Sequence, residues 1–94
     1  MTSRLVARIR ILPAEADSDL DDLILGLKTK IPEDIKLKAH AKEPIAFGLQ
    51  AIIGDFLIDD KEGQIDKLED SIKKTEEVGE IEIINVSRQF VKMT

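Results

Sequence analysis

Glu43-Pro-Ile-Ala-Phe-Gly48, followed by the apolar run Leu49-Gln-Ala-Ile-Ile-Gly-Asp-Phe-Leu-Ile58, decides how this chain is expected to fold. The proline ends the preceding strand because it has no amide hydrogen to donate, and Gly48 frees the backbone for a turn. The run after the turn is apolar on both faces, which is typical of a central strand. The segment therefore predicts two strands joined by a shaped connection that contains Phe47.

Residue periodicity on both sides of this segment predicts the remaining elements. Apolar and polar residues alternate over 4–12, 35–42 and 81–86, whereas 19–31 and 65–74 show helical spacing. We expect Ser18 to cap the first helix, Gly79 to follow the second, and a bulge between Ile83 and Ile84, where the alternation slips. The order strand, helix, strand, strand, helix, strand predicts an α+β, ferredoxin-like βαββαβ sandwich, a four-stranded antiparallel sheet with two helices on one face.

Composition indicates one globular domain over residues 1–94, with 88–94 as a flexible basic tail. The 94 residues are 43% hydrophobic and 35% charged, without cysteine and with His40 as the one histidine, which excludes disulfides and thiolate or multi-histidine metal sites. No apolar run approaches about 18 residues, so we expect no membrane segment. Arg4, Arg8 and Arg10 interrupt the region where a signal peptide is apolar. We therefore expect a cytoplasmic protein without a cofactor.

The formal charge of −5 is unevenly distributed along the chain. Residues 1–12 and 35–42 each contain three basic residues and no acid. Strand alternation puts these side chains on the sheet face without helices: Arg4, Arg8, Arg10, Lys36, Lys38 and Lys42. The central strand adds an apolar stripe to the same face, made of Leu49, Ala51, Ile53 and Leu57. An open face with an apolar centre and basic edges predicts a docking surface, which a homodimer could also cover.

The residues that could carry catalysis do not form a catalytic site. Asp17 begins a run like a calcium loop, but Asp22 stands where that loop needs glycine and Lys28 where it needs glutamate. No phosphate-binding glycine loop, nucleophile elbow or triad is present. The acidic pair Asp59-Asp60 is expected to form a turn. We therefore predict a protein that is not an enzyme and has no metal site.

This chain also lacks the residues that other proteins with a ferredoxin-like fold use to bind metals, phosphates or RNA. Heavy-metal carriers need a Cys-x-x-Cys motif, and acylphosphatases need an arginine loop where this chain has Glu15 and Asp17. RNA-recognition domains stack bases on aromatic residues of the central strands, and this chain has only three aromatics. Nucleic acid is therefore an unfavoured partner, supported only by the basic strand edges.

The segment Glu43–Gly48, the strand after it and the turn Asp59-Asp60-Lys61 together resemble the archaeal translation elongation factor 1-beta family. The resemblance covers nearly the whole chain. It implies a guanine nucleotide exchange factor that promotes GDP release from the elongation factor 1-alpha GTPase during translation elongation. Eukaryotic members carry Pro-x-Gly-aromatic-Gly here, which implies that Phe47 and Gly48 contact the partner. Ala46 stands where those members have their first glycine.

The resemblance also implies a cation that disturbs the metal site of the GTPase. Eukaryotic members use a lysine near the C-terminus, in the pattern Phe-x-Lys-aliphatic. Without a gap after the last strand this position falls on Arg88, our first choice. With a four-residue insertion it falls on Lys92, within Phe90-Val91-Lys92-Met93. The chain shows no amino-terminal extension like that of eukaryotic members, so we expect the exchange module alone.

Two hypotheses therefore stand at the level of sequence. The first is the exchange factor, in which Phe47, Gly48 and either Arg88 or Lys92 contact the partner. The basic strand residues expected at the same contact are Arg8, Arg10, Lys36 and Lys38. The alternative is a ferredoxin-like binding module for RNA, for a small ligand, or for self-association through the open sheet face. In that alternative Phe47 is a core or loop-anchor residue, and the tail is simply solvated.

Overall fold

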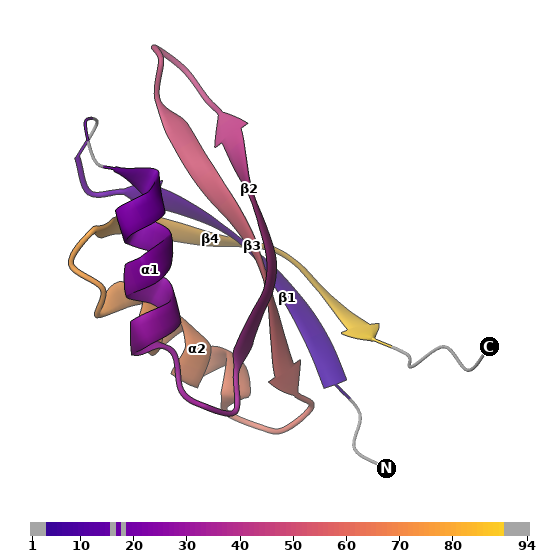
Figure 1. The fold of residues 1–94 in the computed structure, drawn as a ribbon. Coiled ribbons are helices and arrows are strands. Elements are labelled where there is room, and N and C mark those ends of the chain that lie inside the picture. The colour runs from indigo at the N-terminus through magenta and orange to yellow at the C-terminus, as the bar shows by residue number, and fades with distance from the viewer. Residues whose placement is uncertain (1–3, 16, 18, 90–94) are drawn as a thin grey trace.

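The computed structural model describes residues 4–15, 17 and 19–89, and it confirms the predicted order of elements. These are β1 (Arg4–Pro13), α1 (Leu20–Lys30), β2 (Lys36–Pro44), β3 (Gln50–Asp59), α2 (Gln64–Lys73) and β4 (Val78–Gln89). The strands form one antiparallel sheet in the order β2-β3-β1-β4. Both helices cover the same face of this sheet (Figure 1), which is the ferredoxin-like α+β arrangement. Neither helix is long and apolar enough to cross a membrane.

The hydrophobic core lies between the sheet and the helices. Alternate residues of β1 and β3 face it, and one stripe of each helix closes it. Its members are Ala7, Ile9, Ile11, Leu23, Ile24, Leu27, Ile35, Ile52, Phe56, Ile58, Leu68 and Ile72. Removing one such aliphatic or aromatic side chain from water contributes about 1.5–3 kcal/mol. The apolar spacing in the sequence therefore identifies the buried side of every core element.

The N-cap of the first helix lies one residue later in the sequence than predicted. Asp19 is the N-cap, and its carboxylate accepts a hydrogen bond of 2.9 Å from the amide of Asp21. Asp21 and Asp22 add negative charge to the first turn, which favours the positive end of the helix. Ser18, the predicted cap, lies outside the described residues.

The last strand is longer than its alternation predicts. β4 begins at Val78, so Gly79 lies inside the strand. The prediction that Gly79 is the C′ residue directly after α2 is therefore wrong, because α2 ends at Lys73. A Cβ atom at Gly79 would lie 2.8 Å from the carbonyl oxygen of Pro13, so glycine permits this close approach of two strands. At its other end β4 includes Arg88 and Gln89, which therefore belong to the sheet rather than to a tail. Residues 90–94 lie outside the described chain.

Three register shifts interrupt the ladders of the sheet, and the one between Leu12 and Pro13 of β1 leaves Gly79 as an extra residue of β4. The β4 ladder shifts between Arg8 and Ile9 of β1, so Ile84 is an extra residue, as the slip in its alternation predicts. The β2 ladder shifts between Leu37 and Ala39, so Lys38 is also an extra residue. The bulge at Lys38 is not visible in the sequence, and it reverses the facing of every β2 residue that follows it.

Candidate functional site

The connection between β2 and β3 is a tight turn at the tip of a hairpin that projects from the body of the molecule (Figure 1). The amide of Ile45 donates to the carbonyl of Leu49 at 2.9 Å, and the amide of Leu49 donates to the carbonyl of Ala46 at 3.0 Å. The two central residues, Phe47 and Gly48, have φ angles of 57° and 75°. Positive φ at both central positions defines a type I′ turn, which matches the twist of the flanking strands.

Phe47 combines an unfavourable backbone conformation with complete exposure. The left-handed region costs an L-residue about 1–2 kcal/mol, and Phe47 is 99% exposed. The ring therefore gains nothing from packing within the chain, which excludes the alternative of a core or anchor residue. Residues in such strained conformations cluster at functional sites, and they persist only where the surrounding structure enforces them. A contact between Phe47 and a partner stays a prediction.

A small cavity lies next to the turn, where the hairpin meets the end of β1. It has a volume of about 210 Å³ and is lined by Leu12, Pro13, Ala14, Ile45, Leu49 and Gln50. Ile45, which lines this cavity two residues before Phe47, is 40% exposed. Apolar side chains therefore gather beside the turn.

Arg88 lies at the opposite end of the sheet. It stands opposite Leu5 in the ladder between β1 and β4. Its Nη2 atom is 3.1 Å from the Oδ2 atom of Asp60, the residue that follows β3. The sequence predicts a turn at Asp60 but does not predict this ion pair. The signal that could have indicated it is an acid placed directly after a central strand, within reach of a cation on the last strand. Lys92, the second candidate for the intruding cation, lies outside the described residues.

The arginines of β1 are paired with carboxylates across the open sheet face. Arg8 forms two hydrogen bonds with Asp55, with Nε–Oδ1 and Nη2–Oδ2 distances of 2.8 and 3.1 Å. Arg10 bridges β2 and β4, since its Nε lies 3.0 Å from Glu43 and its Nη1 lies 2.6 Å from Glu82. The basic charge predicted for this face is therefore neutralised at Arg8 and Arg10, because other strands of the sheet supply acids at these positions.

The apolar stripe predicted for the centre of this face is also largely covered. Ala51 is fully buried, Ile53 and Leu57 are half-buried, and Asp55 lies between them. The fourth predicted member, Leu49, is half-buried and precedes β3. The stripe is thus interrupted by a charge and is not an exposed apolar surface.

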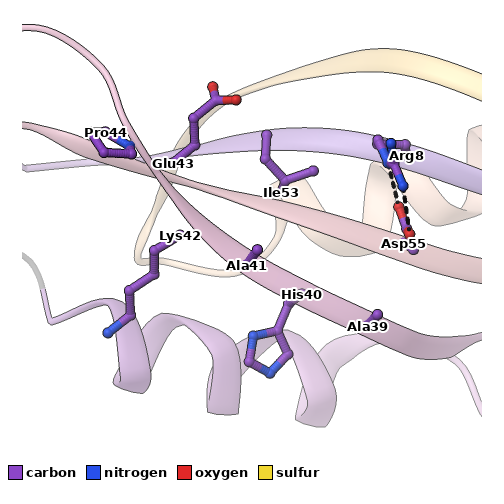
Figure 2. Close-up of a pocket in the computed structure, with 9 residues that line it drawn as sticks. All are labelled: Arg8, Ala39, His40, Ala41, Lys42, Glu43, Pro44, Ile53 and Asp55. Atoms are coloured by element: carbon purple, nitrogen blue, oxygen red, sulfur yellow. Dashed lines mark hydrogen bonds and ion pairs between the residues drawn. The ribbon is translucent and has the colours of Figure 1, made fainter.

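The bulge at Lys38 changes which basic residues of β2 share this face. Lys36 stands opposite Leu57 and so lies on the open face as predicted. Beyond the bulge His40 and Lys42 point to the helix side (Figure 2). There the Nζ of Lys42 lies 3.5 Å from Oδ1 of Asp21 in α1. The predicted position of Lys42 on the helix-free face is therefore wrong.

A concavity of about 400 Å³ lies along the edge strand β2. The β2 residues that line it point alternately to the two faces of the sheet (Figure 2). Ala39, Ala41 and Ile53 supply its apolar part, and the ion pair of Arg8 with Asp55 closes one end. The hydrogen bond from Arg8 lowers the pKa of Asp55 more than burial raises it, and it raises the pKa of Arg8. Both groups are therefore ionised at neutral pH. Within the described residues no three histidine or acidic side chains converge as a metal ion requires.

The chain matches a known protein family over most of its length. Residues 6–88 match the EF-1 guanine nucleotide exchange domain. The chain is 36% identical over 85 residues to elongation factor 1-beta of Methanocella arvoryzae, covering 90% of this chain and 96% of that protein. It is 40% identical over 85 residues to elongation factor 1-beta of Pyrococcus furiosus, covering 89% and 93%. The elongation factor 1-beta of Methanothermobacter thermautotrophicus is 37% identical over 83 residues, covering 88% and 93%.

The matched region runs from Val6 in β1 to Arg88 in β4, so it includes at least part of every element, the Phe47 turn and the ion pair of Arg88 with Asp60. The matches cover nearly the whole of this chain and of each relative, and the order of elements agrees with the fold that residue periodicity predicts. The chain belongs to the family of EF-1 guanine nucleotide exchange domains.

Proposed function

We propose that this chain binds elongation factor 1-alpha through the two ends of its sheet and thereby speeds the release of GDP. Family membership makes the chain a guanine nucleotide exchange factor of translation elongation. The binding mode and the residues that carry it are our inference. We place the protein in the cytoplasm, where translation elongation takes place.

The exposure of Phe47 is the observation that carries the binding mode. A phenyl ring that is 99% exposed and held at a φ of 57° contributes nothing to the core. Large aromatic residues are typical anchors of protein interfaces, where they bury much area at a low cost in side-chain entropy. A pocket on the GTPase that accepts this ring would fix the hairpin end of the exchange factor.

The sheet sets a fixed distance between Phe47 and Arg88. β3 runs from the hairpin to Asp59 in ten residues, which corresponds to about 33 Å of extended strand. Asp60, the ion-pair partner of Arg88, follows directly. The longest dimension of the molecule is 44 Å, so the two contacts lie near its opposite ends. One exchange factor can thus touch two separate regions of the GTPase at once.

Arg88 supplies the charge that weakens nucleotide binding. GTPases hold the nucleotide through a phosphate loop and a Mg²⁺ ion that neutralises the phosphate charge. The pair of Arg88 with Asp60 is partly exposed, and such pairs contribute little to stability, so Arg88 can leave Asp60 at low cost. A cation brought to the metal site lowers the affinity for metal and nucleotide, and nucleotide then lowers the affinity for the exchange factor by the same factor. Lys92 is the alternative source of this charge.

The basic residues of the open face have a smaller part in this proposal. Arg8 and Arg10 already bind carboxylates of the neighbouring strands. We therefore assign the remaining long-range attraction to Lys36, which precedes the bulge of the edge strand, and to Lys38, which is its extra residue. Such charges mainly raise association rates and do so less at high salt.

Release of fluorescent GDP from purified elongation factor 1-alpha tests the function directly. We expect this protein to speed release at substoichiometric concentration, without hydrolysing GTP itself. The matched control is the double variant Phe47→Ala/Arg88→Ala, which should fold like the parent protein and stimulate little. An unchanged release rate at stoichiometric parent protein would contradict the proposal, and salt-sensitive RNA binding in its place would support the alternative module.

A further inference from the structure

Large apolar side chains gather on the second half of β4, next to Arg88. The exposed fraction is 36%, 42% and 39% at Ile83, Ile84 and Val86. Among the described residues only three other large apolar side chains are exposed to this extent, namely Leu25, Ile45 and Phe47. Two of those three belong to the hairpin end. Exposed apolar residues therefore lie beside the turn and along β4 from the middle of the sheet toward Arg88, where the contact has so far been described only by its charge.

The fold leaves this part of β4 without a cover. The first part of the strand packs against the core through Val78 and Ile81. The second part runs beyond both helices (Figure 1), and the register with β1 places Ile83 and Val86 on the helix side of the sheet. Several aliphatic residues exposed together are typical of a surface that binds another molecule.

The bulge at Ile84 argues against pairing of this edge with a second copy of the chain. The ladder to β1 shifts register there. A bulge increases the local twist and bends the strand, and natural proteins use bulges to keep an edge from accepting a further strand. The exposed apolar residues are therefore suited to contact through side chains rather than to extension of the sheet.

Continuity with Arg88 indicates which partner meets these residues. Val86 and Arg88 are two positions apart on the same strand, so they share one side of the sheet and lie about 7 Å apart. A surface that Arg88 approaches must also approach Val86. According to the proposed function, that surface surrounds the metal and phosphate site of elongation factor 1-alpha.

We propose that Ile83, Ile84 and Val86, the β4 apolar surface, dock on an apolar surface of elongation factor 1-alpha beside its nucleotide site. The inference rests on the proposed function and assigns affinity at this end of the sheet to residues other than Arg88. Burial of the β4 apolar surface excludes water around Arg88, and the field of a cation is stronger where water is excluded. The apolar residues thus set how tightly this end binds, and Arg88 sets what binding does to the nucleotide.

The double variant Ile84→Thr/Val86→Thr tests this division. Threonine keeps the β-branched shape that strands favour, so the strand is retained while the surface becomes polar. We expect the concentration for half-maximal GDP release to rise roughly tenfold and the maximal rate to stay within about twofold of the parent. The matched control is Leu25→Thr, which changes a residue that is 61% exposed on α1 and should leave both quantities unchanged.

Three results would overturn the inference. The first is that Ile84→Thr/Val86→Thr, with the circular dichroism and melting temperature of the parent, needs the same concentration as the parent for half-maximal GDP release. The second is a loss of maximal rate without a change in half-maximal concentration. The third is a parent dimer, seen by sedimentation, that Ile84→Thr/Val86→Thr dissociates, because the β4 apolar surface would then bind a second copy. Failure of the proposed function looks different, since the parent itself would not speed GDP release.

Discussion

The two ends of the sheet differ in how they hold the residue that we place at the partner contact. At the hairpin end the backbone hydrogen bonds of the turn hold Phe47 at a strained φ, with its ring fully exposed. At the β4 end Arg88 lies in a strand and binds Asp60, beside aliphatic residues. An apolar ring can add affinity but no charge, whereas a cation can alter a metal site. The comparison therefore separates binding at one end from the effect on nucleotide at the other.

Loss of the charge at the β4 end should give the largest effect. We expect Arg88→Ala to lower the maximal rate of GDP release on the order of tenfold to a hundredfold, since the coupling free energy between two bound ligands is typically about 1–3 kcal/mol. Affinity for nucleotide-free elongation factor 1-alpha should change little, and the rate difference should shrink once Mg²⁺ is chelated. Arg4→Ala is the matched control, because Arg4 also forms an exposed pair, with Asp59 at 3.4 Å.

Truncation after Gln89 completes that experiment. If the truncated protein loses the stimulation and Arg88→Ala keeps it, the intruding cation is Lys92 and the assignment to Arg88 is wrong. If both proteins stimulate like the parent, charge at this end does not drive exchange at all.

Loss of the ring at the hairpin end should give the next largest effect, on binding rather than on rate. Phe47→Ala should weaken affinity for the GTPase roughly tenfold or more, as loss of an aromatic anchor does, with the maximal rate retained. Phe47→Gly should weaken binding equally but raise the free energy of unfolding relative to Phe47→Ala by about 1 kcal/mol, because glycine is not strained at this φ. Titration calorimetry and thermal melts measure the two quantities. A fall in melting temperature like that of a core phenylalanine would remove Phe47 from the contact.

A change in the distance between the two ends should reduce exchange several-fold while leaving both contact residues intact. Adding two residues to β2 and two to β3, next to the turn, moves Phe47 about 7 Å outward and keeps the facing of each strand. Two residues inserted between Pro32 and Glu33 serve as the control, since that loop lies outside the path between the ends. Full activity of the lengthened hairpin would mean that the ends act without a fixed spacing.

The smallest effect concerns the ion pair in the middle of the sheet that joins these ends. The hydrogen bond from Arg8 lowers the pKa of Asp55 in the folded state, so the pair stabilises the fold fully above the ordinary carboxyl pKa of about 3.9. That stabilisation is lost as the pH falls through the lowered pKa of the folded protein. Asp55→Asn should therefore melt slightly below the parent at pH 7, and the difference should shrink as the pH falls below about 4. An equal difference at pH 7 and pH 2 would show that the charge of Asp55 is not responsible.

The sequence predicts the order of elements and the core, because both depend on local periodicity. The helical spacing of Leu23, Leu27, Leu68 and Ile72 and the alternation of Ile9 and Ile11 identify residues that are all buried. The Pro44 to Gly48 pattern likewise predicts the turn between two strands. Periodicity does not show whether a turn residue folds back on the core, so the exposure of Phe47 needed the structure.

Tertiary structure alone decided which charges meet and which faces they share. A bulge at Lys38 reverses the facing of Lys42, and the strand order places Glu43 and Glu82 on either side of Arg10. Pairing with β1 extends β4 to Gln89, so Arg88 is fixed in the sheet near Asp60. These outcomes depend on the register between strands that are distant in the sequence. The sequence by itself thus determined the elements, their apolar faces and the family, whereas the register of the assembled sheet determined the chemistry of its two ends.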